Sequence, residues 1–350
     1  MIRRKQLCAF LKMAVILGIA LAACSDATST RTRDQEPEHE VAAWEQEFLT
    51  DPHDLSAVPL GDGERLRVVA TTSIVADLVA EIGGESIDLT VLIPPGADPH
   101  SFLPTPRDYQ ALTDAHVIFI NGVGLEQFLH ETLEQVAEDV PVVSLSEGID
   151  LRRFAEREDK DHDEGEEHTE GHKTGIDPHV WFDPLNVMIW AENIAQALGA
   201  LDPMGAELYE KNTNGYTEAL QVLHLSIEEL VGRVPEKNRV LVSDHLVFGY
   251  FAERYGFEML GAVIPAYSTA AEPSARELAA LEETMLALDV RAVFVGESVN
   301  PKLAQRVAED TGVFLVPLYT GSLSEPGGPA GTYLELMRYN VEAIVGALGS

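Results

Sequence analysis

Residues 66–93 read LRVVATTSIVADLVAEIGGESIDLTVLI, and this stretch indicates the class of the fold. The apolar run at 66–72 predicts a buried strand, and the apolar spacing over 74–82 predicts an amphipathic helix. A second apolar run at 87–93 predicts another strand. Strand, helix and strand in close succession are typical of α/β folds, so we expect this stretch to open an α/β lobe.

The same alternation continues on both sides of one long predicted helix. Residues 202–234 carry a single helical pattern with Pro203 in its first turn, and about thirty residues at 1.5 Å each span roughly 45 Å. The remaining elements are expected at 106–113, 117–120, 125–137, 140–145, 186–198, 239–242, 246–255, 258–263, 274–288, 292–295, 301–311, 314–318 and 332–348. About 285 folded residues exceed one typical core. We therefore predict two α/β lobes, at 65–200 and 236–350, joined by a long rigid helix at 201–235.

The N-terminus has the pattern of an export signal. Basic residues at 3–5 precede a mostly apolar run at 9–20, which is too short to span a membrane. The run ends in LAAC at 21–24, with small residues before a cysteine, which resembles a bacterial lipobox. We predict that 1–23 is a lipoprotein signal peptide and that Cys24 is lipidated, with ordinary secretory cleavage as the alternative.

The chain is strongly acidic. Its formal net charge is −34, and removal of residues 1–23 would take away four basic and no acidic residues. A surface of this sign repels phosphate backbones and attracts cations, so we expect no nucleic acid partner. Residues 24–64 are polar and lack apolar periodicity, and we predict that they form an acidic, solvated tether. Cys8 lies in the removed segment, so the mature chain is expected to have no disulfide.

Three histidines stand where a predicted strand or loop ends and new regular structure begins: His100, His179 and His245. Binding sites in open α/β sheets collect at the carboxyl ends of strands, so these histidines are candidates to converge between the lobes. Two of them share an Asp-Pro-His frame, with Asp98 and Asp177 as candidate partners of a ring nitrogen. Because the histidines are spread over about 145 positions and form no compact motif, the pattern alone leaves an ordinary structural role open.

From residue 66 to residue 348 the chain resembles the zinc- and manganese-binding lipoproteins of bacterial ABC importers. The stretches that carry the resemblance are VATTS at 69–73, IPPGADPHSF at 93–102, DPHVWFDP at 177–184, YEKN at 209–212 and AEPS at 271–274. The resemblance implies a two-lobed receptor that holds one divalent metal ion in the cleft between its lobes and passes it to a membrane permease.

The resemblance also implies metal ligands residue by residue. His100 and His179 stand at motif positions that ligate the metal in this family, and the third ligand falls on His245 within SDHLVFGYF at 243–251. Zinc-type members place histidine there and many manganese-type members place glutamate, in line with the tolerance of manganese for harder oxygen ligands. The expected cargo is therefore Zn²⁺, with Mn²⁺ as the alternative.

The fourth ligand is open. Many relatives supply an aspartate in the stretch that aligns with 319–323, where this chain has Gly321. The fourth position is left to water, Glu297 or Glu325.

An acidic loop predicted at 156–175 contains His162, His168 and His172. Zinc-type relatives often carry a similar insertion at this place. Such a tract predicts weak, mobile metal gathering, with a merely solvated charged loop as the alternative.

Together these features predict an extracytoplasmic solute-binding protein, not an enzyme, that captures zinc and delivers it to the permease of an ABC importer. We expect a monomer anchored to the membrane through lipidated Cys24, in the periplasm or on the outer surface. A zinc hydrolase is a competing class, because three histidines and an open position also activate water, but no candidate base has a comparable motif placement. An adhesin-like scaffold lipoprotein is a third class.

Overall fold

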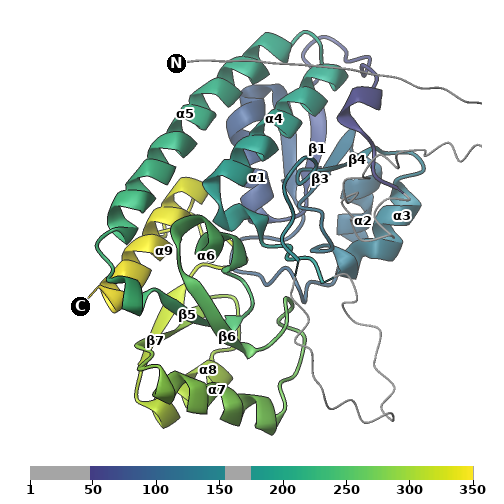
Figure 1. Ribbon diagram of the computed structural model, residues 1–350. Coiled ribbons are helices and arrows are strands. Elements are labelled where there is room, and N and C mark those ends of the chain that lie inside the picture. The colour runs from purple at the N-terminus through teal and green to yellow at the C-terminus, as the bar shows by residue number, and fades with distance from the viewer. Residues whose placement is uncertain (1–47, 154–174, 350) are drawn as a thin grey trace, which may run out of the picture. The chain divides into compact units, whose positions relative to one another are not determined.

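The computed structural model describes residues 48–153 and 175–349 (Figure 1), and all of them fall within one compact unit of the chain. The predicted signal peptide, Cys24 and the three histidines of the predicted acidic loop lie outside these residues. Within the described ranges, no helix combines the length and the apolar composition that a membrane span requires.

The first sheet consists of four parallel strands. These are β1 (Leu66–Ala70), β2 (Ile87–Val91), β3 (Val117–Ile120) and β4 (Val142–Ser144), in the order β2-β1-β3-β4. The helices of this series are α1 (Ser73–Gly83), α2 (Pro106–Thr113), α3 (His130–Val136) and α4 (Pro184–Leu201). Every residue of β3 is buried, as expected for an inner strand of a parallel sheet covered on both faces.

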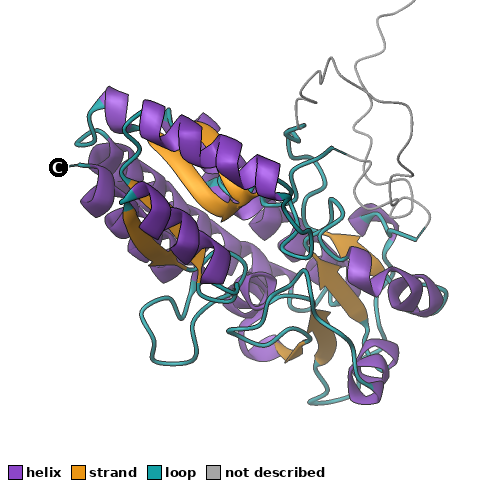
Figure 2. Cartoon of the chain, turned by 90° about the horizontal axis from the view of Figure 1, so that it is seen from below, coloured by secondary structure: helices purple, strands orange, loops and turns teal. Residues whose placement is uncertain are grey.

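The second sheet repeats this arrangement. Its strands are β5 (Val240–His245), β6 (Glu258–Ile264), β7 (Ala292–Gly296) and β8 (Phe314–Leu318), all parallel and in the order β6-β5-β7-β8. Its helices are α6 (Gly249–Tyr255), α7 (Ala275–Ala287), α8 (Lys302–Thr311) and α9 (Tyr333–Leu348). Figure 2 shows the strands of both sheets flanked by helices. The predicted class of two α/β lobes is confirmed.

Both sheets share one topological feature that places binding sites. In each, the chain pairs its second strand on one side of the first and its third strand on the other side. The crevice at such a reversal, at the carboxyl ends of the strands, is where open α/β sheets bind ligands. The residues that follow β1 and β5 are therefore the natural positions for a site.

The long helix is α5 (Ala206–Val231), and it begins later than the predicted start at 202. A turn intervenes because the carboxylate of Asp202 accepts hydrogen bonds from the backbone N–H of Met204 and from the hydroxyl of Tyr209. The 26 residues of α5 span about 39 Å. This helix packs against α1 and α4 of the first series and against α9 of the second (Figure 1).

The predicted tether is wrong for its last part. Leu49 pairs with Val142 of β4 as an extra parallel bridge, and the N–H of Thr50 donates to the carbonyl of Val142 at 2.8 Å. The N–H of Val58 donates to the carbonyl of Leu201 at 2.8 Å. Residues from 48 onward thus pack against the first lobe, and their apolar side chains are too few and too irregularly spaced to show a strand or helix period.

The helix predicted at 125–137 is also shorter than expected. It is divided into a 3-10 helix at Gln127–Leu129 and α3. Val123 has a φ of 60°, so the backbone before this segment makes a tight turn rather than a helical start.

Candidate metal site

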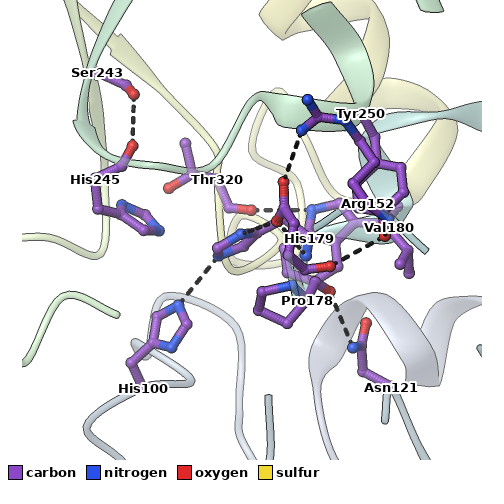
Figure 3. A network of polar contacts seen from close by, with 12 residues as sticks. His100, Asn121, Arg152, Pro178, His179, Val180, Ser243, His245, Tyr250 and Thr320 are labelled. Atoms are coloured by element: carbon purple, nitrogen blue, oxygen red, sulfur yellow. Dashed lines mark hydrogen bonds and ion pairs between the residues drawn. The ribbon is translucent and has the colours of Figure 1, made fainter. Parts of the chain in front are cut away.

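The three histidines singled out from the sequence come together in the structure. One ring nitrogen from each of His100, His179 and His245 lies within 4.8 Å of the others, and in the described residues this is the one such group that could hold a metal ion. Nε2 of His179 lies 3.3 Å from Nε2 of His100 (Figure 3). His179 and His245 are buried, whereas His100 is half-buried.

The two lobes contribute these side chains from three different segments. His100 lies in the turn after β2. His179 directly precedes the 3-10 helix at Val180–Phe182, which leads into α4. His245 is the last residue of β5. The strand predicted at 239–242 therefore continues to the ligand itself, because its backbone still pairs with β6 at Ile264.

Asp177 holds the ring of His179. Its Oδ1 lies 2.9 Å from Nδ1 of the imidazole and accepts the backbone N–H of the same residue at 3.0 Å. A carboxylate in this position keeps the ring proton on Nδ1, so the lone pair of Nε2 faces His100. Burial, and next the nearby His245, lowers the pKa of His179 well below its usual value. The imidazole is therefore neutral near pH 7, which is the form that binds metal.

Asp244 holds the ring of His245 in the same way. Its Oδ1 lies 2.6 Å from Nδ1 of His245 and accepts the backbone N–H of that residue at 2.6 Å. Its Oδ2 accepts the N–H of Gly296 in β7 at 2.6 Å. This partner was not singled out from the sequence. The available signal was a carboxylate directly before a histidine at the end of a buried strand.

Asp98 has a different role from the one expected. Its Oδ1 accepts the backbone N–H of His100 at 3.0 Å, and its Oδ2 accepts the hydroxyl of Thr269 at 2.6 Å. Thr269 follows β6 in the second lobe. Asp98 thus contacts the backbone of the histidine beside it and joins the two lobes.

The carboxylate of Asp177 is completely buried and has one cationic neighbour. Nη1 of Arg152 lies 3.4 Å from its Oδ2, while Nε of Arg152 binds Glu253 at 2.5 Å. Burial raises the pKa of Asp177 to about 7, although its hydrogen bond from His179 and the charge of Arg152 favour the ionised form. Gly249 allows this packing, since a Cβ there would overlap both Asp177 and Arg152.

Aromatic rings shield the histidines from solvent. The ring centroid of Trp181 lies 5.3 Å from that of His179, and the ring centroid of Tyr267 lies 6.2 Å from it. Nε1 of Trp181 donates to the carbonyl of Thr320 at 3.1 Å, which links the first lobe to the segment after β8. These rings form a low-dielectric wall that strengthens electrostatic interactions with the histidines.

The carboxylates considered for a fourth position line a neighbouring cavity of about 280 Å³. Glu297 and Glu325 both face this cavity, and neither belongs to the group of described ligand atoms that lie within 4.8 Å of one another. A Cβ at Gly321 would lie 2.8 Å from Cδ of Pro99, so the proline next to His100 packs directly on the glycine backbone.

Comparison with known proteins places this geometry in a family. A family model described as zinc-uptake complex component A, periplasmic, matches residues 68–347. A manganese-binding lipoprotein of Halalkalibacterium halodurans is 35% identical over 288 residues, which cover 82% of this chain and 90% of the relative. A manganese ABC transporter substrate-binding lipoprotein of Streptococcus pneumoniae is 31% identical over 293 residues, with the same coverage of 82% and 90%.

Solved structures of metal-binding proteins have a similar fold. A periplasmic zinc binding protein from Treponema pallidum aligns with a TM-score of 0.73 at 28% identity, covering 82% of this chain and 99% of that chain. An Mn-bound periplasmic metal binding protein from Candidatus Liberibacter asiaticus aligns with a TM-score of 0.70 at 26% identity, covering 81% of this chain and 100% of that chain. The chain therefore belongs to the family of periplasmic zinc-uptake component A proteins, the metal-binding substrate-binding components of ABC transporters.

Proposed function

We propose that this protein captures one divalent transition-metal ion, zinc by preference, through His100, His179 and His245 and delivers it to the permease of an ABC importer. The observation that carries the proposal is the convergence of three ring nitrogens within 4.8 Å of one another, two of them on imidazoles held by a buried carboxylate. Orientation by a carboxylate on the second ring nitrogen is what metal-ligating histidines ordinarily have.

One distance supports a tetrahedral ion. Nε2 of His179 and Nε2 of His100 are 3.3 Å apart. Two ligands at the Zn–N distance of about 2.0–2.1 Å, separated by the tetrahedral angle, would be about 3.3 Å apart. The two nitrogens thus already have the spacing that a shared zinc ion requires.

The charges around the histidines support a dication. Imidazole ligands add no charge to a bound metal ion, while Asp177 and Asp244 lie just behind His179 and His245 with side chains that are 0% and 4% exposed. Two buried carboxylates balance a doubly charged ion, and the ion in turn favours their ionised forms. The protein would therefore hold the metal without a ligating carboxylate.

The donor set favours zinc over manganese. Imidazole nitrogen suits zinc, whereas manganese takes carboxylate and other hard oxygen ligands. The relatives from Halalkalibacterium and Streptococcus are named for manganese, and the family model and the Treponema structure are named for zinc. The three histidines of this chain, with Gly321 in place of a carboxylate, support zinc as the preferred ion.

Isothermal titration calorimetry on the chelator-treated protein tests this function. We expect one zinc ion per chain, bound more tightly than manganese in direct competition. Replacement of all three histidines by alanine should abolish this binding. Tight one-to-one zinc binding that survives in the triple variant would overturn the site, and tighter binding of manganese would overturn the zinc preference.

A lipid anchor would keep the protein close to its importer. We propose that Cys24 becomes lipidated after removal of residues 1–23, so that the monomeric receptor diffuses beside its permease. Mass spectrometry of the mature chain should find a diacylated N-terminal cysteine, and Cys24→Ser should release the protein from the membrane fraction. Retention of the Cys24→Ser variant in that fraction would contradict the anchor.

A further inference from the structure

The turn that carries the first histidine is held by the second lobe. The N–H of Gly96 donates to Oγ of Ser322 at 2.8 Å, and Pro99 packs against the backbone of Gly321. Gly96 and Pro99 belong to the first lobe, and the residues that hold them lie in the segment of the second lobe that follows β8. The position of this turn therefore depends on contact between the lobes.

A second contact reaches the turn from the segment that follows β6. Oγ1 of Thr269 donates to Oδ2 of Asp98 at 2.6 Å, and Oδ1 of the same carboxylate accepts the backbone N–H of His100 at 3.0 Å. One carboxylate thus connects a second-lobe hydroxyl to the backbone of a histidine of the metal site. A hydrogen bond from a hydroxyl to a carboxylate is stronger than one between two neutral groups.

The segment that carries Thr269 also lies next to His179 and to the residue that follows His245. The carbonyl of Ala266 accepts the N–H of Leu246, the residue after His245, at 2.9 Å. The ring centroid of Tyr267 lies 6.2 Å from that of His179. Residues 266–269 therefore lie close to all three histidines, and Thr269 is the member that contacts the frame of His100.

From this geometry we propose that Thr269 is a positioning residue for metal retention, an inference that rests on the proposed function. Its hydroxyl binds Asp98, and Asp98 binds the backbone N–H of His100. This contact keeps the ring of His100 close enough to the other two histidines to share a metal ion with them. Loss of the hydroxyl lets the turn of the first lobe move away from the second lobe, and the metal ion then leaves faster.

Stopped-flow release of zinc into a chromophoric chelator tests the inference. Thr269→Val keeps the branched shape and removes the donor, and we expect zinc to dissociate about tenfold faster, as for loss of a hydrogen bond to a charged group. Thr269→Ser keeps the donor and should stay within about twofold of wild type. Thr284→Val is the matched control, because its hydroxyl donates to Ala280 within the exposed face of α7.

A double-variant cycle separates positioning from a general effect on the second lobe. In an Asp98→Ala background the hydroxyl has lost its acceptor, so Thr269→Val should change the release rate less than about twofold. An equal acceleration in both backgrounds, or an unchanged rate in Thr269→Val alone, would overturn the inference. If replacement of all three histidines by alanine still abolishes zinc binding in either case, the proposed function stands and only the role of Thr269 fails.

Discussion

The two Asp-Pro-His frames have the same sequence, but their carboxylates make different contacts. Asp177 is fully buried and contacts both the ring and the backbone of His179, and its own carbonyl accepts the hydroxyl of Tyr250 in the second lobe. Asp98 contacts the backbone of His100 and reaches Thr269 in the other lobe. In the frame at 177–179 the carboxylate holds the ring of its ligand directly. In the frame at 98–100 the carboxylate holds the backbone of its ligand and is itself held by a hydroxyl of the other lobe. A shared tripeptide therefore predicts the position of a ligand, and its environment decides how firmly that ligand is held.

Removal of each ligand gives the largest effect and the first test of this difference. His179→Ala should weaken zinc binding by more than the roughly 10–100-fold expected for loss of an outer partner, because it removes a fixed ligand and leaves Asp177 without its ring partner. His100→Ala should weaken binding less. Calorimetry of the chelator-treated variants measures both, with His53→Ala as control, since His53 is exposed and bonds to Gln196. Equal losses in the two variants would break the comparison.

Replacement of the carboxylates comes next in size. Asp177→Asn removes a buried negative charge behind the metal, and we expect roughly 10–100-fold weaker zinc binding. Asp98→Asn keeps an oxygen that accepts the N–H of His100, so its loss should be below about tenfold. Competition against a zinc chelator of known affinity gives both values. A larger loss in Asp98→Asn than in Asp177→Asn would reverse the roles given to the two frames.

Several parts of the molecule follow from local sequence physics. The helix at Pro106–Thr113 has the bounds expected from the sequence. Thr105 and Asp108 form a capping box and Pro106 occupies the first turn, so local contacts fix where this helix begins. The strand at Val117–Ile120 was predicted equally well, since a short apolar run between turn residues has few alternatives in an α/β chain. In both cases the determining contacts lie within a few residues.

The parts that sequence did not predict depend on distant contacts. Pairing of Leu49 with Val142 joins residues far apart in the chain, and no local period announces it. The role of Asp244 depends on where β5 ends, which is set by its pairing with β6 rather than by its own apolar run. The Asp-Pro-His motif indicated the ring partner of His179 correctly. It could not indicate that Asp98 binds the backbone of His100 and the hydroxyl of Thr269, because the second of these contacts joins two lobes.

The buried support of the frame at 177–179 predicts a pH dependence of stability. Glu126 accepts the N–H of Asn121 at 2.8 Å, and the side chain of Asn121 donates to the carbonyl of Pro178 at 3.1 Å. Burial raises the pKa of Glu126 from 4.5 to about 7. The folded state therefore binds the extra proton between these values, and the free energy of unfolding falls as pH rises through this window.

Urea unfolding of the metal-free protein at about pH 5 and about pH 7 measures this contribution. Glu126→Gln should flatten the fall by up to about 1.4 kcal/mol per pH unit, because it removes the titrating group. Glu131→Gln is the matched control on the same segment, since Glu131 is exposed. The same slope in wild type and Glu126→Gln would show that the frame of His179 draws no pH-dependent support from this carboxylate.

The smallest expected effect concerns the contact of the frame at 98–100 with the second lobe. In Gly321→Ala the added Cβ would lie 2.8 Å from Cδ of Pro99, so either the turn of His100 or the segment after β8 must shift. Overpacking in a core costs about 1–3 kcal/mol, and a turn at a lobe boundary yields more easily, so zinc and manganese affinity should each fall by about fivefold or less. Gly321→Asp adds the same Cβ and also a carboxylate, which is a hard oxygen ligand, so relative to the alanine variant it should regain affinity for manganese more than for zinc. Competition titrations of the two variants against both metals separate the steric cost from the ligand. A manganese-to-zinc ratio that is the same in both variants would mean that position 321 does not reach the metal, and that close packing on Pro99 is its whole contribution.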